Sequence, residues 1–351
     1  MGNEPLPQVH RAILYSEPGR SAQTEVKEIP LVPPKEGEIL VRLSYSGVCH
    51  TDLSFCLGLF SNLPVPVPDG AGVVVALGPG VTSPAIGSRV GIMYSADACL
   101  TCDQCLDGGE SSCRSAKVSG YITPGTFQQY CIASARYVIP IPDKLELADA
   151  APLMCGGVSV YTALKRGGLR PGQWVAVCGA GGGLGHLGIQ YAKALGGRVL
   201  ALDIGSKRDL CNSLGADVFL DFTEFQSSSD LAAKIRQVTE GGARYVLMCA
   251  SSSKAYSQAM SWLGFRGTLL CLGVPDYEGS LIPSIGNMIS KELRIIATKS
   301  GNRVDIKECL EIAAQGRVKA FYELRKMDEL TEVFDEITKG NIKGRIVLDL
   351  N

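Results

Sequence analysis

Short apolar runs alternate with helical segments throughout the second half of the chain, and this order limits the fold more than any other feature. The apolar runs span residues 174–177, 199–202, 218–220, 245–249 and 268–272, and helical patterns such as 184–195 and 231–238 lie between them. A strand–helix–strand order repeated in this way is typical of a parallel, doubly wound sheet. We therefore predict an α/β fold, with residues 293–296 as a candidate sixth strand.

A glycine-rich turn follows the first of these strands. Residues 179–185 read Gly-Ala-Gly-Gly-Gly-Leu-Gly and lead directly into a helical pattern. Pyrophosphate needs such a turn, because larger side chains would block its approach to the N–H groups at the positive end of a helix. The strict G-x-G-x-x-G spacing is met only as Ala180-x-Gly182-x-x-Gly185. Between a strand and a helix, this turn indicates a Rossmann-type dinucleotide-binding domain.

The charged residues after the next strand bear on the choice of cofactor. Asp203 ends that strand, about twenty residues beyond the glycines, where a carboxylate binds the adenosine ribose and repels a 2′-phosphate. We therefore predict NAD as the cofactor. Lys207 and Arg208 follow closely, and because either cation could meet a phosphate, NADP stays open as an alternative.

The first part of the chain has a different pattern, in which short apolar runs are broken by proline and glycine. These runs are residues 39–43, 72–77 and 89–93. They are typical of an antiparallel, barrel-like domain. Residues 305–314 and 328–338 have helical patterns, and residues 345–348 form a last predicted strand. A chain of 351 residues fits two domains at roughly 150 residues each.

Four of the thirteen cysteines form a close cluster. Cys99, Cys102, Cys105 and Cys113 have the spacing C-x2-C-x2-C-x7-C, which is too tight for separate disulfides. The spacing suits four thiolates around one tetrahedral ion. The total of thirteen is odd, so a full set of internal disulfides is impossible, and a reducing compartment fits the cysteines better.

Composition argues against several classes of function. The 34 Lys and Arg residues nearly balance 35 Asp and Glu residues, and 46% of the chain is hydrophobic. This balance argues against disorder and against a nucleic-acid partner. The sequence shows neither a run of about eighteen apolar residues nor the apolar segment of a signal peptide. We therefore expect no membrane span and a cytoplasmic location.

Several segments, in order along nearly the whole chain, resemble the zinc-containing medium-chain alcohol dehydrogenases, most closely the yeast type. Besides the four-cysteine cluster, the matching segments are residues 47–53, 119–121, 125–130, 151–155 and 301–303. The resemblance implies a GroES-like catalytic domain made of residues 1–156 and 292–351, with a zinc lobe at 95–115, and a Rossmann domain at 157–291. It also implies a structural zinc on the four clustered cysteines, a small-molecule substrate and a homodimer or homotetramer.

The same resemblance implies which residues bind the cofactor and act on the substrate. NAD would meet the substrate in a cleft. The cofactor-binding positions are His50, Thr51, Gly181, Gly182, Gly183, Leu184, Asp203, Lys207, Arg208, Leu272, Val274, Thr298, Ser300 and Arg345. Thr51 and Tyr94 occupy pocket-facing positions and are candidate hydrogen-bond donors to the substrate, and Asp52 is a third candidate catalytic residue.

The chain departs from the family where the catalytic zinc is bound. The family uses a Cys, a His and a second Cys, and the matching positions here are Cys49, Pro68 and Cys155. Proline has no metal-binding atom on its side chain, and the three histidines of the chain are not placed to substitute. The family's proton relay is also incomplete, because Ser54 stands where its histidine would be.

These departures predict a change of chemistry. Without a Lewis acid a simple ketone accepts hydride poorly, whereas an iminium ion or a conjugated enone already carries the electron deficiency that zinc would impose. We therefore predict a reductase of an activated C=C or C=N bond, with a structural zinc only. One alternative is an alcohol dehydrogenase or carbonyl reductase with zinc on Cys49, Asp69 and Cys155. Another is a non-redox catalyst or a dinucleotide-binding protein on the same fold.

Overall fold

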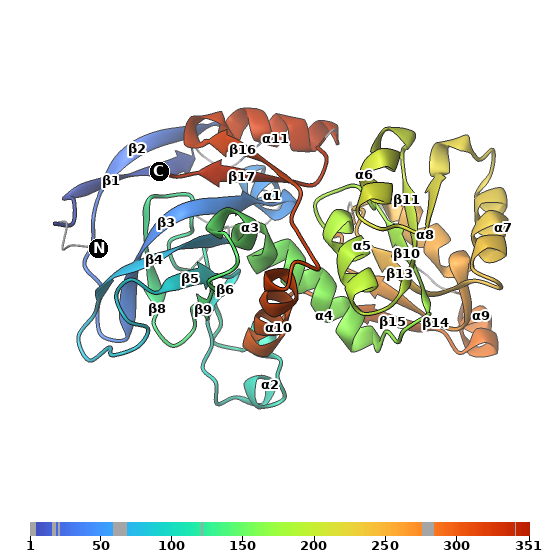
Figure 1. Ribbon diagram of the computed structural model, residues 1–351, viewed down its shortest axis with the longest axis horizontal. Coiled ribbons are helices and arrows are strands. Elements are labelled where there is room, and N and C mark those ends of the chain that lie inside the picture. The colour runs from blue at the N-terminus through green and yellow to red at the C-terminus, as the bar shows by residue number, and fades with distance from the viewer. Residues whose placement is uncertain are drawn as a thin grey trace. The chain divides into compact units, whose positions relative to one another are not determined.

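The computed structural model describes residues 5–15, 19, 22–58, 69–120, 122–275, 284–340 and 342–351 (Figure 1). The chain divides into two compact units. The first unit contains Met1–Cys155, Gly301–Ala314 and Tyr322–Asn351. The second unit contains Gly156–Ser300 and Gln315–Phe321. Each unit has its own main sheet and its own apolar core.

A six-stranded parallel sheet forms the centre of the second unit. Its strands lie in the order β12–β11–β10–β13–β14–β15. They are β10 (Trp174–Cys178), β11 (Arg198–Asp203), β12 (Val218–Asp221), β13 (Ala243–Met248), β14 (Leu263–Cys271) and β15 (Arg294–Ala297). The order reverses between β10 and β13, and sheets of this kind bind ligands at the carboxyl ends of the strands at that point. The predicted doubly wound sheet is confirmed, with its sixth strand.

Side chains of β10 point alternately toward two layers of helices. Ala176 and Cys178 belong to an apolar core with residues of α7 (Ser228–Val238) and α8 (Ser253–Trp262). On the opposite face, α5 (Gly185–Ala194) packs so closely that a Cβ on Gly188 would lie 2.7 Å from a Leu247 methyl carbon and 3.7 Å from one of Val177. The remaining helical elements are α4 (Val158–Gly167), η3 (Gly205–Lys207), α6 (Arg208–Ser213), η4 (Phe222–Glu224) and α9 (Ile285–Lys291).

One helical segment, Leu147–Gly167, is long and apolar enough to cross a membrane by length and composition. It consists of α3 (Leu147–Pro152), the π-helical turn η2 (Leu153–Gly157) and α4. From the sequence we expect no membrane span, because no run of about eighteen apolar residues occurs. Of the most apolar window, 83% is buried inside the protein. A buried core helix passes the same test, so this segment is weak evidence for a membrane span.

The first unit is built around a seven-stranded sheet. Its strands lie in the order β16–β17–β3–β4–β5–β9, with β8 beside β3. They are β3 (Glu38–Val48), β4 (Gly70–Leu77), β5 (Arg89–Ile92), β8 (Tyr130–Ser134), β9 (Ile139–Pro140), β16 (Tyr322–Lys326) and β17 (Arg345–Asp349). Only β16 and β17 pair in parallel. Val41, Val74 and Val90 pack in its core, which confirms the predicted antiparallel, GroES-like domain.

Smaller elements complete the first unit. Strand β1 (Val9–Tyr15) pairs with β2 (Thr24–Pro30), and β6 (Ser95–Asp97) pairs with β7 (Lys117–Val118). Its other helices and turns are α1 (His50–Cys56), α2 (Asp103–Leu106), η1 (Glu110–Ser112), α10 (Arg303–Ala314), η5 (Met327–Glu329) and α11 (Leu330–Lys339). The blue N-terminal strands and the red C-terminal strands in Figure 1 belong to this same unit.

The observed units differ from the predicted domain boundaries. The sequence analysis predicts a boundary at residue 292, whereas residues up to Ser300 belong to the second unit. The reason is that β15 pairs in parallel with β14, with Leu269 opposite Ile295. Residues 315–321 also belong to the second unit, because the Gln190 side chain in α5 bonds both the N–H and the C=O of Lys319 at 2.9 Å.

Candidate functional site

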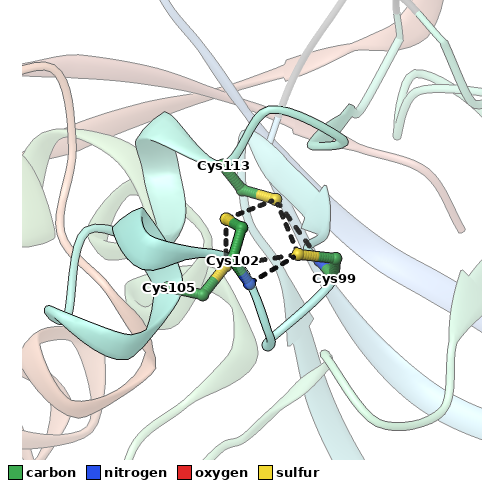
Figure 2. A group of neighbouring side chains, drawn as sticks. All are labelled: Cys99, Cys102, Cys105 and Cys113. Carbon is green, nitrogen blue, oxygen red and sulfur yellow. Dashed lines mark hydrogen bonds between the residues drawn. The ribbon is translucent and has the colours of Figure 1, made fainter.

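Four cysteines of the first unit meet in a small lobe (Figure 2). Cys99 and Cys102 precede α2, Cys105 lies within it, and Cys113 follows η1. Their Sγ atoms all lie within 4.8 Å of one another, and four of the separations are 3.5, 3.6, 3.9 and 3.9 Å. Four sulfurs at a Zn–S distance of about 2.3 Å form a tetrahedron with edges of roughly 3.8 Å. The donor set therefore fits a tetrahedral zinc ion.

Backbone N–H groups point at the sulfurs of this lobe. Cys99 Sγ accepts from the N–H of Cys102 at 3.3 Å, and Cys113 Sγ accepts from the N–H groups of Cys99 and Ser115 at 3.4 and 3.3 Å. Hydrogen bonds to sulfur favour the thiolate, which is the form of cysteine that binds a metal. The backbone therefore favours the charge state that zinc requires.

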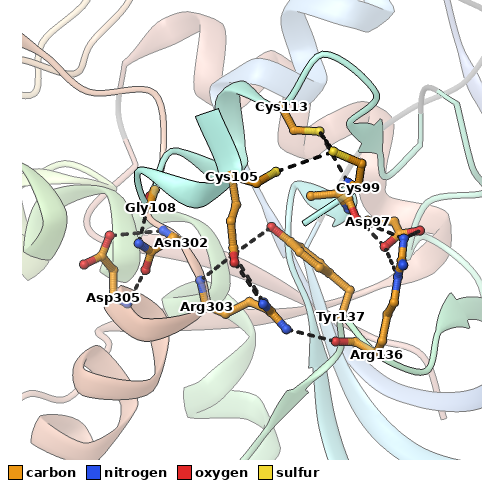
Figure 3. Close-up of polar contacts among 12 residues, drawn as sticks. Asp97, Cys99, Cys105, Gly108, Cys113, Arg136, Tyr137, Asn302, Arg303 and Asp305 are labelled. Atoms are coloured by element: carbon orange, nitrogen blue, oxygen red, sulfur yellow. Dashed lines mark hydrogen bonds and ion pairs between the residues drawn. The ribbon is translucent and has the colours of Figure 1, made fainter. Parts of the chain in front are cut away.

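A buried carboxylate ties this lobe to α10 (Figure 3). Glu110 accepts hydrogen bonds from Arg303 Nε and Nη2, at 3.2 and 2.9 Å, and from the Arg303 backbone N–H at 3.2 Å. The Tyr137 hydroxyl donates to the same carboxylate at 3.2 Å. Because Glu110 lies between the third and fourth cysteines, these bonds fix the loop that closes the lobe. The sequence analysis does not single out Glu110, since its partner lies 193 residues away.

Further contacts hold the lobe on two sides (Figure 3). The Asn302 side chain donates to the Gly108 oxygen at 2.8 Å, next to Glu110 in the loop. Arg136 pairs with Asp97 at 3.1 Å and donates to the Ala98 oxygen at 2.9 Å, just before the first cysteine. The start of the lobe and its closing loop are therefore both hydrogen-bonded to the rest of the first unit.

A second group of polar side chains lies where β3, α1 and η2 meet. Cys49 follows β3 and caps α1, and its Sγ lies 3.7 Å from Cys155 Sγ in η2. Arg345 is buried at the start of β17, which pairs with β3. Its guanidinium donates to the Val48 oxygen at 3.1 Å and lies 3.9 Å from Cys155 Sγ. The fold thus brings together Cys49, Cys155 and Arg345.

Asp69 lies just before β4 and is buried. Burial raises its pKa to about 7 and the charge of Cys49 adds to the rise, while hydrogen bonds to Cys155 and to the backbone of half-buried Tyr94 oppose it. In the described parts of the chain, only the four-cysteine lobe brings three or more metal-binding atoms within 4.8 Å of one another, so Cys49, Asp69 and Cys155 do not form a second such group. Pro68 lies outside the described residues.

The other predicted catalytic residues lie on α1. Thr51 Oγ1 is 3.7 Å from Cys49 Sγ. Asp52 is buried, and its carboxylate accepts from the Cys49 N–H at 2.6 Å, so this side chain positions Cys49. Burial holds the pKa of Asp52 well above its ordinary value, and the charge of Cys49 adds to the rise. His50 is exposed, and its Nδ1 lies 3.5 Å from Ser54 Oγ.

The remaining two histidines lie in other elements. His10 is in β1 and packs edge-on against Tyr130, with ring centroids 5.6 Å apart. His186 is in α5 of the second unit, and its Nδ1 lies 3.0 Å from the Gly182 oxygen. Both are therefore core histidines of their own elements.

The glycine turn of the second unit is shaped by backbone contacts. Gly179 has φ +74°, and a Cβ on Gly185 would lie 2.0 Å from the Gly179 oxygen, so packing requires glycine at both positions. A Cβ on Gly182 would meet nothing closer than 3.4 Å. The space beside Gly182 therefore suits a phosphate that approaches the first N–H groups of α5. The predicted Gly181, Gly182, Gly183 and Leu184 lie immediately before this helix.

Asp203 contacts this turn from the end of β11. Its Oδ2 accepts from the Gly181 N–H at 2.8 Å. Lys207 packs over the same glycine, where a Cβ would lie 2.7 Å from Lys207 Cβ. Each carboxylate oxygen has two lone pairs, so Asp203 can still accept hydrogen bonds from ribose hydroxyls. Asp203 and Lys207 therefore fit the adenosine end of a dinucleotide.

Four further cofactor candidates follow β14 and β15. They are Leu272, Val274, Thr298 and Ser300. The Leu272 N–H donates to the Met248 oxygen at 3.2 Å, and the Thr298 N–H donates to the Cys271 oxygen at 3.0 Å. Because the strands are parallel, these residues lie at the same edge of the sheet as the glycine turn. The candidates His50, Thr51 and Arg345 belong to the first unit.

Comparisons with known proteins agree with this geometry. Residues 35–143 match the alcohol dehydrogenase GroES-like domain, and residues 183–315 match the zinc-binding dehydrogenase family. Alcohol dehydrogenase 2 of Emericella nidulans is 42% identical and alcohol dehydrogenase of Schizosaccharomyces pombe 39%, each over 99% of both chains. The structure of acetophenone reductase from Geotrichum candidum, in complex with NAD, has a TM-score of 0.85 at 28% identity, covering 99% of this chain and 98% of that chain. The chain belongs to the zinc-type medium-chain alcohol dehydrogenase family.

Membership of the alcohol dehydrogenase family makes the protein an NAD(P)-dependent oxidoreductase, as predicted. It also supports NAD and zinc as cofactors, and the four-cysteine lobe provides a zinc site. The number of zinc ions, the oligomeric state and the cytoplasmic location stay predictions.

We expect the purified protein to contain about one zinc per chain, because among the residues that the structure describes only the four-cysteine lobe offers a complete tetrahedral donor set. Elemental analysis measures this count. Cys105→Ser should remove the metal, whereas Cys155→Ser should leave the count unchanged. Two zinc ions per chain in the wild type, with one lost in Cys155→Ser, would contradict the prediction.

Glu110→Gln should speed the loss of zinc from the lobe, because a glutamine side chain cannot pair ionically with Arg303 and the closing loop then opens more easily. Substitutions around metal ligands typically weaken binding by 10–100-fold, and we expect a roughly tenfold faster release. A chromogenic chelator measures the rate. Glu323→Gln is the control, since Glu323 pairs instead with Arg325 at 2.8 Å. Equal release rates in the two variants would show that the Glu110 contacts do not retain the metal.

Proposed function

We propose that the protein is a reductase of an activated C=C or C=N bond that uses NADH and works without a catalytic zinc. The observation that carries the proposal is the group of side chains around Cys49. Two sulfurs lie 3.7 Å apart. Beside them lie the guanidinium of Arg345, 3.9 Å from Cys155 Sγ, and the buried carboxyl group of Asp69, which hydrogen-bonds Cys155. A catalytic zinc site needs three protein ligands and an open position. Here two sulfurs are present, and a cation takes part in the cluster.

The residue at the position of the family's histidine supports the same proposal. By resemblance to the family, Pro68 stands where the imidazole ligand would be, and proline has no donor atom on its side chain. Asp69 is the next residue along the chain and offers a carboxylate instead of a neutral nitrogen. Its oxygens do not form a compact ligand group with Cys49 and Cys155.

Hydride transfer to an activated bond has less need of a Lewis acid. An iminium carbon loses its positive charge as hydride arrives, and a conjugated enone spreads the new negative charge onto its oxygen. A simple aldehyde or ketone needs its developing alkoxide stabilised, and a metal would supply several kcal/mol of that stabilisation. Acceptors with built-in electron deficiency therefore match this site best.

Each candidate residue has a defined role in this proposal. Bound NADH supplies the hydride, and the glycine turn and Asp203 bind and orient it. Thr51 donates a hydrogen bond to the oxygen of an enone, and Tyr94 is the second candidate donor. Asp52 keeps Cys49 and the start of α1 in place through its 2.6 Å hydrogen bond. For an iminium substrate no proton transfer is needed, because hydride addition to carbon leaves a neutral amine.

A second candidate function keeps the metal, and one observation favours it. The Oδ1 atom of Asp69 is buried and has no hydrogen-bond partner among the described residues. A buried acceptor of this kind is unfavourable unless a proton or a cation meets it. Zinc on Cys49, Asp69 and Cys155 would satisfy it and would make the protein an alcohol dehydrogenase or carbonyl reductase.

We expect the protein to reduce a conjugated enone or a cyclic iminium and to oxidise ethanol negligibly, since Thr51 alone must stabilise an alkoxide. With NADH deuterated at C4, mass spectrometry should find deuterium on the substrate carbon. Cys155→Ala should keep most of this activity, because its sulfur binds no catalytic metal.

The opposite pattern would support the second candidate function. It consists of rapid ethanol oxidation that a chelator stops and that Cys155→Ala and Asp69→Ala both abolish. Zinc content of the same samples should then fall from two ions to one in each variant.

NADH should bind more tightly than NADPH by roughly tenfold or more, because Asp203 meets the 2′-phosphate with like charge. Titration of nicotinamide fluorescence measures both affinities without a substrate. Asp203→Ala should narrow the difference between the affinities for NADH and NADPH. Equal or tighter binding of NADPH by the wild type would contradict the predicted preference.

A further inference from the structure

Arg208, the second cation after Asp203, is held by a neighbouring segment of the second unit. Its guanidinium lies 3.3 Å from a Glu224 carboxylate oxygen and 4.6 Å from the centre of the Phe219 ring. Phe219 lies in β12, and Glu224 ends η4, which directly follows β12. An ion pair and a cation–π contact therefore draw Arg208 toward the same segment.

The same segment also braces the turn that leads from Asp203 to Arg208. Asp221 ends β12 and lies opposite Asp203 in the parallel register of β11 and β12. Its carboxylate accepts from the N–H and the hydroxyl of Thr223 at 2.9 and 2.7 Å, and also from the Gly205 N–H. Because Gly205 begins η3, this bond anchors the turn that carries Arg208.

Arg208 is close to the place where a 2′-phosphate would extend from the cofactor. Asp203 marks the position of the adenosine ribose, and NADP carries its extra phosphate on that ribose. The positive charge of Arg208 acts on Asp221, the strand neighbour of Asp203. In NADP-dependent proteins of this fold, an arginine near the ribose accommodates the phosphate. Here Glu224 balances the charge of that arginine instead.

We infer that Glu224 and Phe219 are specificity-determining residues, which favour NADH by holding Arg208 away from the 2′-phosphate. This inference rests on the proposed preference for NADH. It adds the Glu224–Arg208 ion pair to Asp203 as a second cause of that preference. Asp203 repels the phosphate, and Glu224 withholds the cation that would compensate for the repulsion. Both members of the pair are partly exposed, at 42% and 64%, so the effect is a change of a few fold in affinity.

The test measures the affinity of purified protein for NADPH and NADH by fluorescence titration. Glu224→Gln should strengthen NADPH binding by about threefold to fivefold, the range expected when a partly exposed ion pair is lost. NADH binding should stay unchanged, because NADH has no 2′-phosphate on its adenosine ribose for Arg208 to meet. In an Arg208→Gln background, Glu224→Gln should have no effect on NADPH binding.

Two variants serve as matched controls. Glu240→Gln breaks a similar ion pair elsewhere in the second unit. Arg198 lies 3.3 Å from the Glu240 carboxylate and 4.0 Å from the centre of the Trp174 ring, as Arg208 lies near Glu224 and Phe219. Asp209→Asn removes one negative charge directly beside Arg208 in the chain. Both variants should leave NADPH binding within about twofold of the wild type, since neither releases Arg208.

Three results would overturn the inference. One is an effect of Glu224→Gln on NADPH binding no larger than that of Asp209→Asn. Another is a gain in NADPH affinity from Glu224→Gln that persists in the Arg208→Gln background. A third is loss of NADPH binding in the Arg208→Gln single variant, which would show that Arg208 already meets the phosphate. By contrast, a wild-type preference for NADPH refutes the proposed cofactor preference, whatever the variants do.

Discussion

Close backbone packing between Gly179 and Gly185 is the constraint on which the second unit depends. A Cβ on Gly185 would lie 2.0 Å from the Gly179 oxygen, so β10 can turn into α5 only because that side chain is absent. The position of the turn lets the Gly181 N–H bond Asp203 at 2.8 Å. It also places α5 so that Gln190 bonds the backbone of Lys319. The position of Asp203, a proposed cofactor-binding residue, and that of the segment 315–321 thus both depend on this one turn.

Sequence patterns predicted the parts of the fold and site whose signal is local. Strands β10 to β14 are largely buried, and buried parallel strands read as continuous apolar runs. The cysteine spacing likewise predicted the metal lobe. The predicted boundary at residue 292 came from the family resemblance, whereas the contacts of β15 with β14 place residues up to Ser300 in the second unit. No local pattern marks contacts between distant residues, such as Glu110 with Arg303.

The two cysteine sites of the first unit differ in how completely they surround an ion. The lobe has four sulfurs at tetrahedral separations, N–H groups that favour thiolates, and Glu110 bonds that hold its closing loop. Cys49 and Cys155 contribute only one pair of sulfurs at a tetrahedral separation. Their other neighbours are the Arg345 guanidinium and buried carboxyl groups. A metal site is stable when ligands and their supporting contacts are both present. By that criterion the four-cysteine lobe has the donors and supporting contacts that a zinc ion needs, and the lack of a zinc ion on Cys49 and Cys155 stays part of the proposed function.

The charges around Cys49 also distinguish between the two acceptors proposed. Asp52 and Asp69 are both buried near the two sulfurs, and burial raises the pKa of each, which holds these carboxyl groups toward the neutral form. Any ionised fraction opposes a developing alkoxide or enolate. Arg345 offsets part of this effect, but its guanidinium is already directed to the Val48 oxygen and toward Cys155. An iminium ion needs no oxyanion stabilised in the transition state. Its attraction to ionised neighbours is lost as hydride neutralises its charge, so that attraction aids binding and not the hydride transfer. Within the proposed function, the charge distribution around Cys49 therefore favours the binding of a cationic C=N acceptor over that of a neutral enone.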